Sequence, residues 1–71
     1  MESQKVAGNS RKNIYIGSVV EVVKKIHQRT GQLTLGKVKR VLTKSATHPH
    51  GIKVQLESGE VGRVKWVLIT S

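Results

Sequence analysis

The sequence predicts an all-β domain, a small SH3-like barrel of four to five short antiparallel strands. From Ile14 onward, short runs of β-branched residues are separated by Gly, Ser, Thr and Pro, which is typical of strands joined by tight turns. Apolar residues do not recur at helical spacing over a long enough stretch to indicate a helix. So short a chain favours an SH3-like barrel over an oligonucleotide-binding barrel, which usually needs more residues.

Four segments are predicted as strands, and the third, residues 52–57, alternates strictly between apolar and polar residues, as half-buried strands do. They are residues 18–24, 36–43, 52–57 and 61–67. In the first segment, Val20 and Val22 flank an outward-facing glutamate. Tyr15 and Ile16 can add a leading strand, and residues 68–70 a short closing strand or a single turn.

The turn between the last two strands sets their register. A two-residue loop would place apolar residues opposite charged ones, although opposed residues share a face of the sheet. A three-residue loop, residues 57–59, instead pairs Val54 with Gly62 on the inner face and Lys53 with Arg63 on the outer face. It also places a glycine, the last residue of the loop, at the left-handed position that such loops favour. In this register Trp66 follows Val64 on the inner face, which predicts a core anchor, with a surface contact as the alternative.

Residues 1–13 differ from the rest of the chain because they contain few apolar residues and several charged ones. We expect a flexible basic N-terminal arm there and the barrel domain at residues 14–71. Cysteine is absent, so the chain has no need of an oxidising compartment. Without a secretion signal or an apolar run long enough to span a bilayer, we expect a cytoplasmic monomer with no membrane partner.

Positive charge dominates the composition. Thirteen Lys and Arg compare with four acidic residues, so the 71 residues carry a formal charge of +9. Such an excess attracts phosphate backbones at long range and gains free energy when their counterions are released. Nucleic acid is therefore the expected partner, with RNA favoured over DNA. Trp66 and Tyr15 are the only aromatic residues, too few for a platform of stacked unpaired bases, so we expect structured RNA.

The candidate phosphate contacts are basic side chains on the outer face of the predicted sheet and at its loop edge. They are Lys37, Lys39, Arg40, Lys53, Arg63 and Lys65, with Arg29 and His50 at the loop edge. Like charges opposed across a sheet are destabilising, so this basic surface suits an anion placed between them. The alternatives are a solvated face that only prevents aggregation, or a protein interaction module that binds an acidic or extended peptide.

Other chemistry finds little support in the sequence. Residues 31–37 have the spacing of a phosphate-binding loop, but Val38 stands where the magnesium-binding Ser or Thr belongs. The run from His48 to His50 offers two imidazoles and His27 a third, yet the chain contains no Cys or Asp to complete a metal site. No acid–base pair or activated nucleophile is evident. We therefore expect a non-enzyme with no catalytic residues, no metal and no cofactor.

Several short motifs carry a resemblance to a known family. They are Gln28-Arg29-Thr30-Gly31, Leu33-Thr34, Leu42-Thr43, the run from His48 to Val54 (HPHGIKV), and Gly62-Arg63-Val64, with Gly36, Val38, Leu56 and Gly59 between them. Over about residues 18–67 the chain resembles the YwbE-like family of small, functionally uncharacterised proteins. The resemblance implies no substrate, cofactor or catalytic residue. Because its marked positions include loops, it favours a binding edge.

Overall fold

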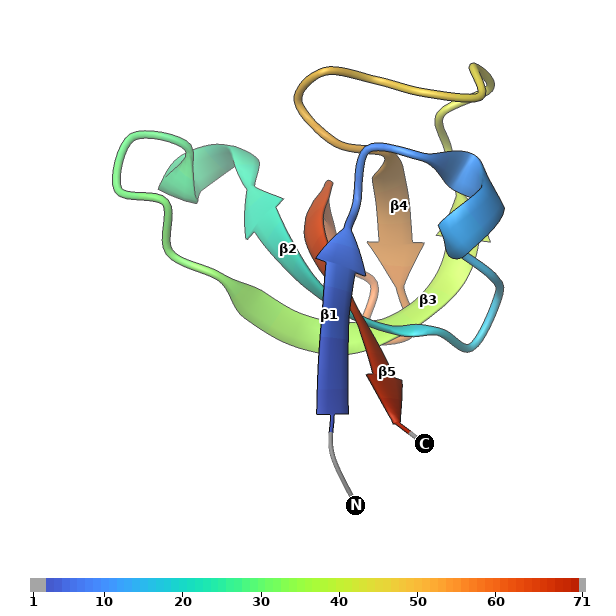
Figure 1. Ribbon diagram of the computed structural model, residues 1–71. Helices are drawn as coiled ribbons and strands as arrows, with labels where there is room; N and C mark the ends of the chain where they lie inside the picture. The colour runs from blue at the N-terminus through green and yellow to red at the C-terminus, as the bar shows by residue number, and fades with distance from the viewer. Residues whose placement is uncertain (1–2, 71) are drawn as a thin grey trace.

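The computed structural model describes residues 3–70, which form five strands and two single-turn 3-10 helices (Figure 1). In chain order they are β1 (Ser3–Ala7), η1 (Arg11–Asn13), β2 (Val19–Lys24), η2 (Lys25–His27), β3 (Thr34–Val41), β4 (Lys53–Leu56) and β5 (Val61–Thr70). Within these residues there is no α-helix, and no helix is long and apolar enough to cross a membrane.

Four of the strands close into a barrel. β2 pairs with β3, β3 with β4, β4 with β5, and β5 with β2, and every pairing is antiparallel. β3 and β5 therefore lie on opposite sides of the barrel, with β2 and β4 between them. The prediction of an all-β, SH3-like barrel of four to five antiparallel strands is confirmed.

β5 is the strand that joins the barrel to the remaining strand. Along one edge it pairs with β2, from Gly62 to Leu68. Along its other edge it pairs first with β4, over residues 61–63, and then with β1, over residues 66–70. β1 thus extends the sheet beyond the barrel and lies beside the C-terminal half of β5 (Figure 1).

The described part of the expected flexible arm, residues 3–13, is instead part of the sheet and its loops; residues 1 and 2 lie outside the described chain. β1 pairs with β5 along its whole length, and Val6 packs against the core. Farther along, the backbone amide of Arg11 donates to the carbonyl oxygen of Ala46 at 2.8 Å. Backbone hydrogen bonds order this segment, so its low apolar content was a poor guide.

The core is formed by small and medium aliphatic side chains that are at most 5% exposed. They are Ile14, Val20, Val22, Val38, Ile52, Val54, Leu56, Val64 and Val67. The predicted hairpin register is confirmed, because Lys53 lies opposite Arg63 and Val54 opposite Gly62. Gly59 has a φ of +94°, the left-handed conformation that the three-residue loop requires.

Two bulges interrupt the alternation of the strands, one in β5 against β2 and one in β3 against β4. In β5 the bulge leaves Lys65 and Trp66 outside the core, between the buried Val64 and Val67. The prediction that Trp66 anchors the core is therefore wrong. An extra residue in one strand shifts the phase of all that follow, and the sequence analysis had assumed strict alternation.

Several strand bounds differ from prediction, and the second predicted strand, residues 36–43, runs instead from Thr34 to Val41. Residues 68–70 continue β5 and form neither a separate strand nor a turn. Tyr15 and Ile16 form no strand but lie in a turn, where the Ser18 amide donates to the Tyr15 carbonyl oxygen at 2.9 Å. Both side chains are largely exposed, at 68% and 77%.

Candidate nucleic-acid interface

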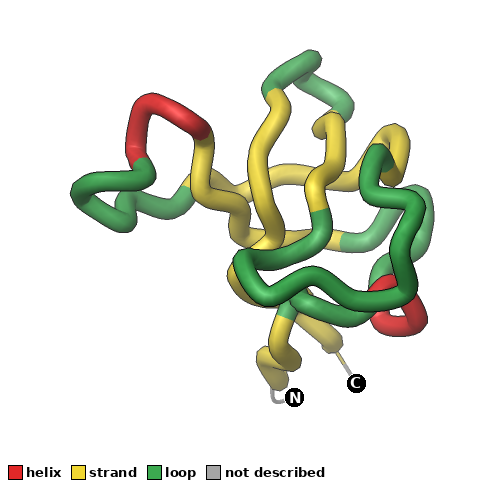
Figure 2. Tube along the Cα trace, turned by 90° about the horizontal axis from the view of Figure 1, so that it is seen from above, coloured by secondary structure: helices red, strands yellow, loops and turns green. Residues whose placement is uncertain are grey.

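A groove of about 820 Å³ crosses the outer face of β5. One wall is the turn that follows η2 and projects from the barrel; the other is the connection between β3 and β4 (Figure 1, Figure 2). Arg63, Lys65 and Trp66 line it from β5. Gln28 comes from the first wall and His50 from the second. The two loop motifs of the sequence analysis, far apart in the chain, thus face one groove.

The floor of the groove is formed by backbone. Gly8 and Gly51 are buried and both lie against the backbone of Val64. A Cβ atom on either residue would stand within 2.4 Å of the Val64 carbonyl oxygen, much closer than real contacts. Gly51 also has a φ of +101°, which L side chains rarely adopt. Only glycine fits these two positions, because a missing side chain lets each loop lie directly against β5.

The charged side chains of the groove lining, Arg63 and Lys65, are both basic. Beside it lies a smaller hollow of about 410 Å³, which shares Arg63 with the groove and adds Lys25 and Lys53. The Arg63 guanidinium donates from Nη1 to the Gly51 carbonyl oxygen at 3.2 Å, so its position is fixed by the loop. None of the described residues that line the groove or the hollow is acidic. An anion bound here would meet no opposing carboxylate in the lining.

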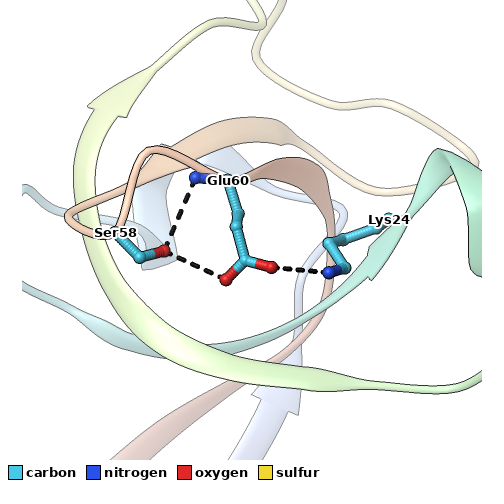
Figure 3. Close-up of polar contacts among 3 residues, drawn as sticks. All are labelled: Lys24, Ser58 and Glu60. Carbon is cyan, nitrogen blue, oxygen red and sulfur yellow. Dashed lines mark hydrogen bonds and ion pairs between the residues drawn. The ribbon is translucent and has the colours of Figure 1, made fainter.

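Two carboxylates of the barrel form ion pairs with lysines outside the groove lining, and Glu57 is exposed in the β4–β5 turn. Glu21 forms an ion pair with Lys5 at 3.0 Å, and Glu60 forms one with Lys24 at 2.5 Å. Glu60 also accepts a hydrogen bond from the Ser58 hydroxyl at 3.0 Å within the β4–β5 turn, and its contact with Lys24 ties that turn to β2 (Figure 3). The hydrogen bonds from Lys24 and Ser58 hold the pKa of Glu60 below its usual value.

The histidine loop is ordered by its own hydrogen bonds. The backbone amide of His50 donates to Nδ1 of His48 at 3.1 Å, and the Gly51 amide donates to the His48 carbonyl oxygen at 3.0 Å. Partial burial, together with the charges of Arg63 and His50, lowers the pKa of His48. Among the described residues no group of three or more His, Cys, Asp or Glu could hold a metal ion.

The structure divides the predicted phosphate contacts into two sets. Arg63, Lys65 and His50 line the groove, and Lys53 lines the adjoining hollow. Arg29 is exposed in the turn that forms one wall, although its neighbours rather than Arg29 itself line the groove. The second set lies on β3, across the barrel from β5. It comprises Lys37, Lys39 and Arg40, all exposed.

Lys37 and Lys39 were therefore placed wrongly as neighbours of Lys53 in one basic surface. The β3–β4 bulge and the long loop after β3 put Thr43, not a lysine, beside Lys53, whose amide donates to the Thr43 hydroxyl at 2.7 Å. Sequence reasoning also missed Trp66 as a groove residue. The signal available was the spacing of Val64 and Val67, three residues apart, which strict alternation cannot bury together.

Comparison with known proteins identifies the family. The family described as "Uncharacterized conserved protein (DUF2196)" matches residues 7–67. The chain belongs to this family. It is also 51% identical over 63 residues to "Uncharacterized protein YwbE" of Bacillus subtilis (strain 168), across 89% of this chain and 97% of that protein. The predicted resemblance is confirmed, and the family match begins earlier than expected, at Ala7, the last residue of β1. No solved structure matches the chain.

Proposed function

We propose that the protein binds structured RNA through contacts between its basic outer face at β5 and the phosphate backbone. The observation that carries the proposal is the groove lined by Arg63, Lys65 and His50, with Lys25 and Lys53 beside it and no acidic residue in the described lining. A concave, single-sign surface concentrates the field on a bound polyanion. The formal charge of +9 supplies the long-range attraction.

The proposal is a binding function and includes no catalytic residue, metal or cofactor. It takes the protein to act as a monomer in the cytoplasm, with RNA as the partner in preference to DNA. The alternative partner, an acidic or extended peptide, would use the edge of β1 that faces away from β5, since strand addition needs unpaired backbone groups.

The test compares two matched charge reversals. In the first, Lys53→Glu and Lys65→Glu are combined; in the second, Lys37→Glu and Lys39→Glu are combined on β3. All four side chains are exposed, so both variants should fold. We expect the first variant to weaken binding to a hairpin RNA at low salt by about tenfold or more, and to lower the salt slope by about one for each lysine that contacts phosphate. The second variant should retain most of the affinity.

Two results would contradict the proposal. Equal weakening by the two variants would mean that net charge alone, and not the β5 face, determines binding. Affinity for an acidic peptide that is independent of salt, with no affinity for RNA, would favour strand addition at β1 instead.

A further inference from the structure

Trp66 occupies a position in the groove that charge does not explain. The bulge in β5 turns it out of the core, and its paired neighbours are Ala7 on β1 and Glu21 on β2. Ala7 is too small to cover an indole ring, and Trp66 is only partly buried. The one tryptophan of the chain thus presents part of its ring to the groove.

We infer that this groove binds a single unpaired nucleotide of an RNA, with the base against Trp66 and the phosphate on Arg63 and Lys65. The inference rests on the proposed RNA-binding function and names the part of the RNA that enters the groove. An exposed aromatic ring stacks on any base, because every base has a π face. One ring serves one base, so a structured RNA with a bulged or looped-out nucleotide is the partner that fits.

The lining around Trp66 suits a base better than it suits a paired backbone. Val23, Leu33 and Pro49 add apolar surface to the groove. A phosphate backbone would gain nothing from these side chains, whereas an unstacked base buries both of its faces against such surface. Asn9 and Gln28 also line the groove, and their amides offer the donors and acceptors that pair with base edges.

The floor and the cations complete the site. Gly8 and Gly51 let their loops lie directly against the β5 backbone, so backbone rather than side chains lines the groove there. Arg63 is held in place by its hydrogen bond to the Gly51 carbonyl oxygen, and its remaining donors are available to a phosphate. Lys65 adjoins Trp66 in the same bulge, so base and phosphate of one nucleotide can be bound together.

The fluorescence of Trp66 tests the inference directly, because no other tryptophan contributes. Two hairpin RNAs of equal length and charge are titrated, one with a single bulged nucleotide and one with the same nucleotide paired; a mononucleotide provides a third arm. The bulged hairpin should quench Trp66 and bind more tightly than the paired one. Trp66→Leu, which removes the ring but keeps an apolar side chain, should weaken binding of the bulged hairpin about tenfold and leave the paired one nearly unchanged.

The matched control is Tyr15→Leu, which removes the other aromatic ring of the chain from an exposed turn that pairs with β3. It should change neither quenching nor affinity. Unfolding curves test whether both variants fold. If Trp66→Leu does not fold, quenching of Trp66 in the parent protein still tests the inference.

Each outcome has a defined reading. If both hairpins bind equally and Trp66 is not quenched, while Lys53→Glu with Lys65→Glu still weakens both, this inference is overturned and the proposed RNA-binding function stands. If neither hairpin binds, this inference and the proposed RNA-binding function both fail, unless the mononucleotide quenches Trp66. That last result would support a base-binding site but assign it to a free nucleotide.

Discussion

β3 and β5 contain the same local sequence feature on opposite sides of the barrel, yet they present different surfaces. Val38-Lys39-Arg40-Val41 in β3 and Val64-Lys65-Trp66-Val67 in β5 each place a bulge between two inward-facing valines. In β3 the two outward residues stand exposed on an open surface. In β5 the outward pair is flanked by β1 and by two loops, and it lines a groove.

The comparison shows that a bulge selects which side chains point outward, whereas the neighbouring segments decide whether those side chains form a site. On the β5 face, a Cβ added to Gly8 or Gly51 would collide with the backbone of Val64 on β5. The glycine on β3, Gly36, faces only the end of the flexible Leu56 side chain, at 2.7 Å from a hypothetical Cβ. The groove side of the barrel therefore tolerates less change than the β3 side.

The largest expected effect tests this difference in tolerance. Gly51→Ala combines a positive φ with a Cβ that would stand 2.4 Å from the Val64 carbonyl oxygen, so it should cost about 3 kcal/mol of the free energy of unfolding. Gly36→Ala should cost less, about 1 kcal/mol, because the atoms nearest its Cβ belong to the Leu56 side chain and not to backbone. Denaturant unfolding of both variants measures the difference. Equal losses would show that the groove floor is no more constrained than β3.

A second pair of variants separates packing from backbone conformation in the hairpin that begins β5. Gly62→Val should cost about 1 to 3 kcal/mol, because a Cβ there would lie 2.9 Å from the Val23 carbonyl oxygen and from the Val22 side chain. Gly59→Ala should cost about 1 kcal/mol through its φ alone, since no atom lies within 4 Å of the new Cβ. Thermal unfolding ranks the two. A Gly62→Val protein that melts like the parent would show that β2 and β5 can separate at no cost.

The smallest expected effects depend on pH and compare the histidine loop with the β4–β5 turn. His48 has a folded-state pKa below its usual 6.5, so the unfolded chain binds more protons as the pH falls below that value. Stability should therefore fall with pH through this range, and His48→Gln should reduce the fall. Glu60 has a pKa lowered from 4.5, so its stabilising contribution should be present above pH 4.5 and be lost below it.

Unfolding of the parent, His48→Gln and Glu60→Gln at pH 7, 5.5 and 3.5 measures both effects. The His48 variant should differ from the parent in its change between pH 7 and 5.5, and the Glu60 variant in its change between pH 5.5 and 3.5. Identical pH dependence of all three proteins would mean that neither contact distinguishes folded from unfolded protein.

The sequence predicted those parts of the structure that depend on local chemistry. Strict alternation from Ile52 to Leu56, and a glycine where a three-residue loop needs one, were enough for the fold class and for the hairpin register. The pairing of Lys53 with Arg63 followed from that register. Such features follow from residues within a few positions of one another.

The remaining features depend on contacts between distant segments. β1 gains its order from hydrogen bonds to β5, which its own composition does not reveal. The groove forms because the turn after η2 and the histidine loop flank the same strand, and because a bulge in β5 turns the Trp66 side chain out of the core. Spacing within one strand cannot locate a segment that lies across the barrel, so Lys37 and Lys39 were assigned to the wrong face.

The pairing of β1 with β5 has a consequence for how the chain is made. Ser3 lies opposite Thr70, so the earliest and the latest of the five described strands pair with each other. β4 and β2 also need β5 to close the barrel. The nascent chain therefore carries unpaired strand edges until β5 has been synthesised, and it must then close long loops, which slows folding. During that interval the net positive charge of each chain repels other copies and opposes their aggregation.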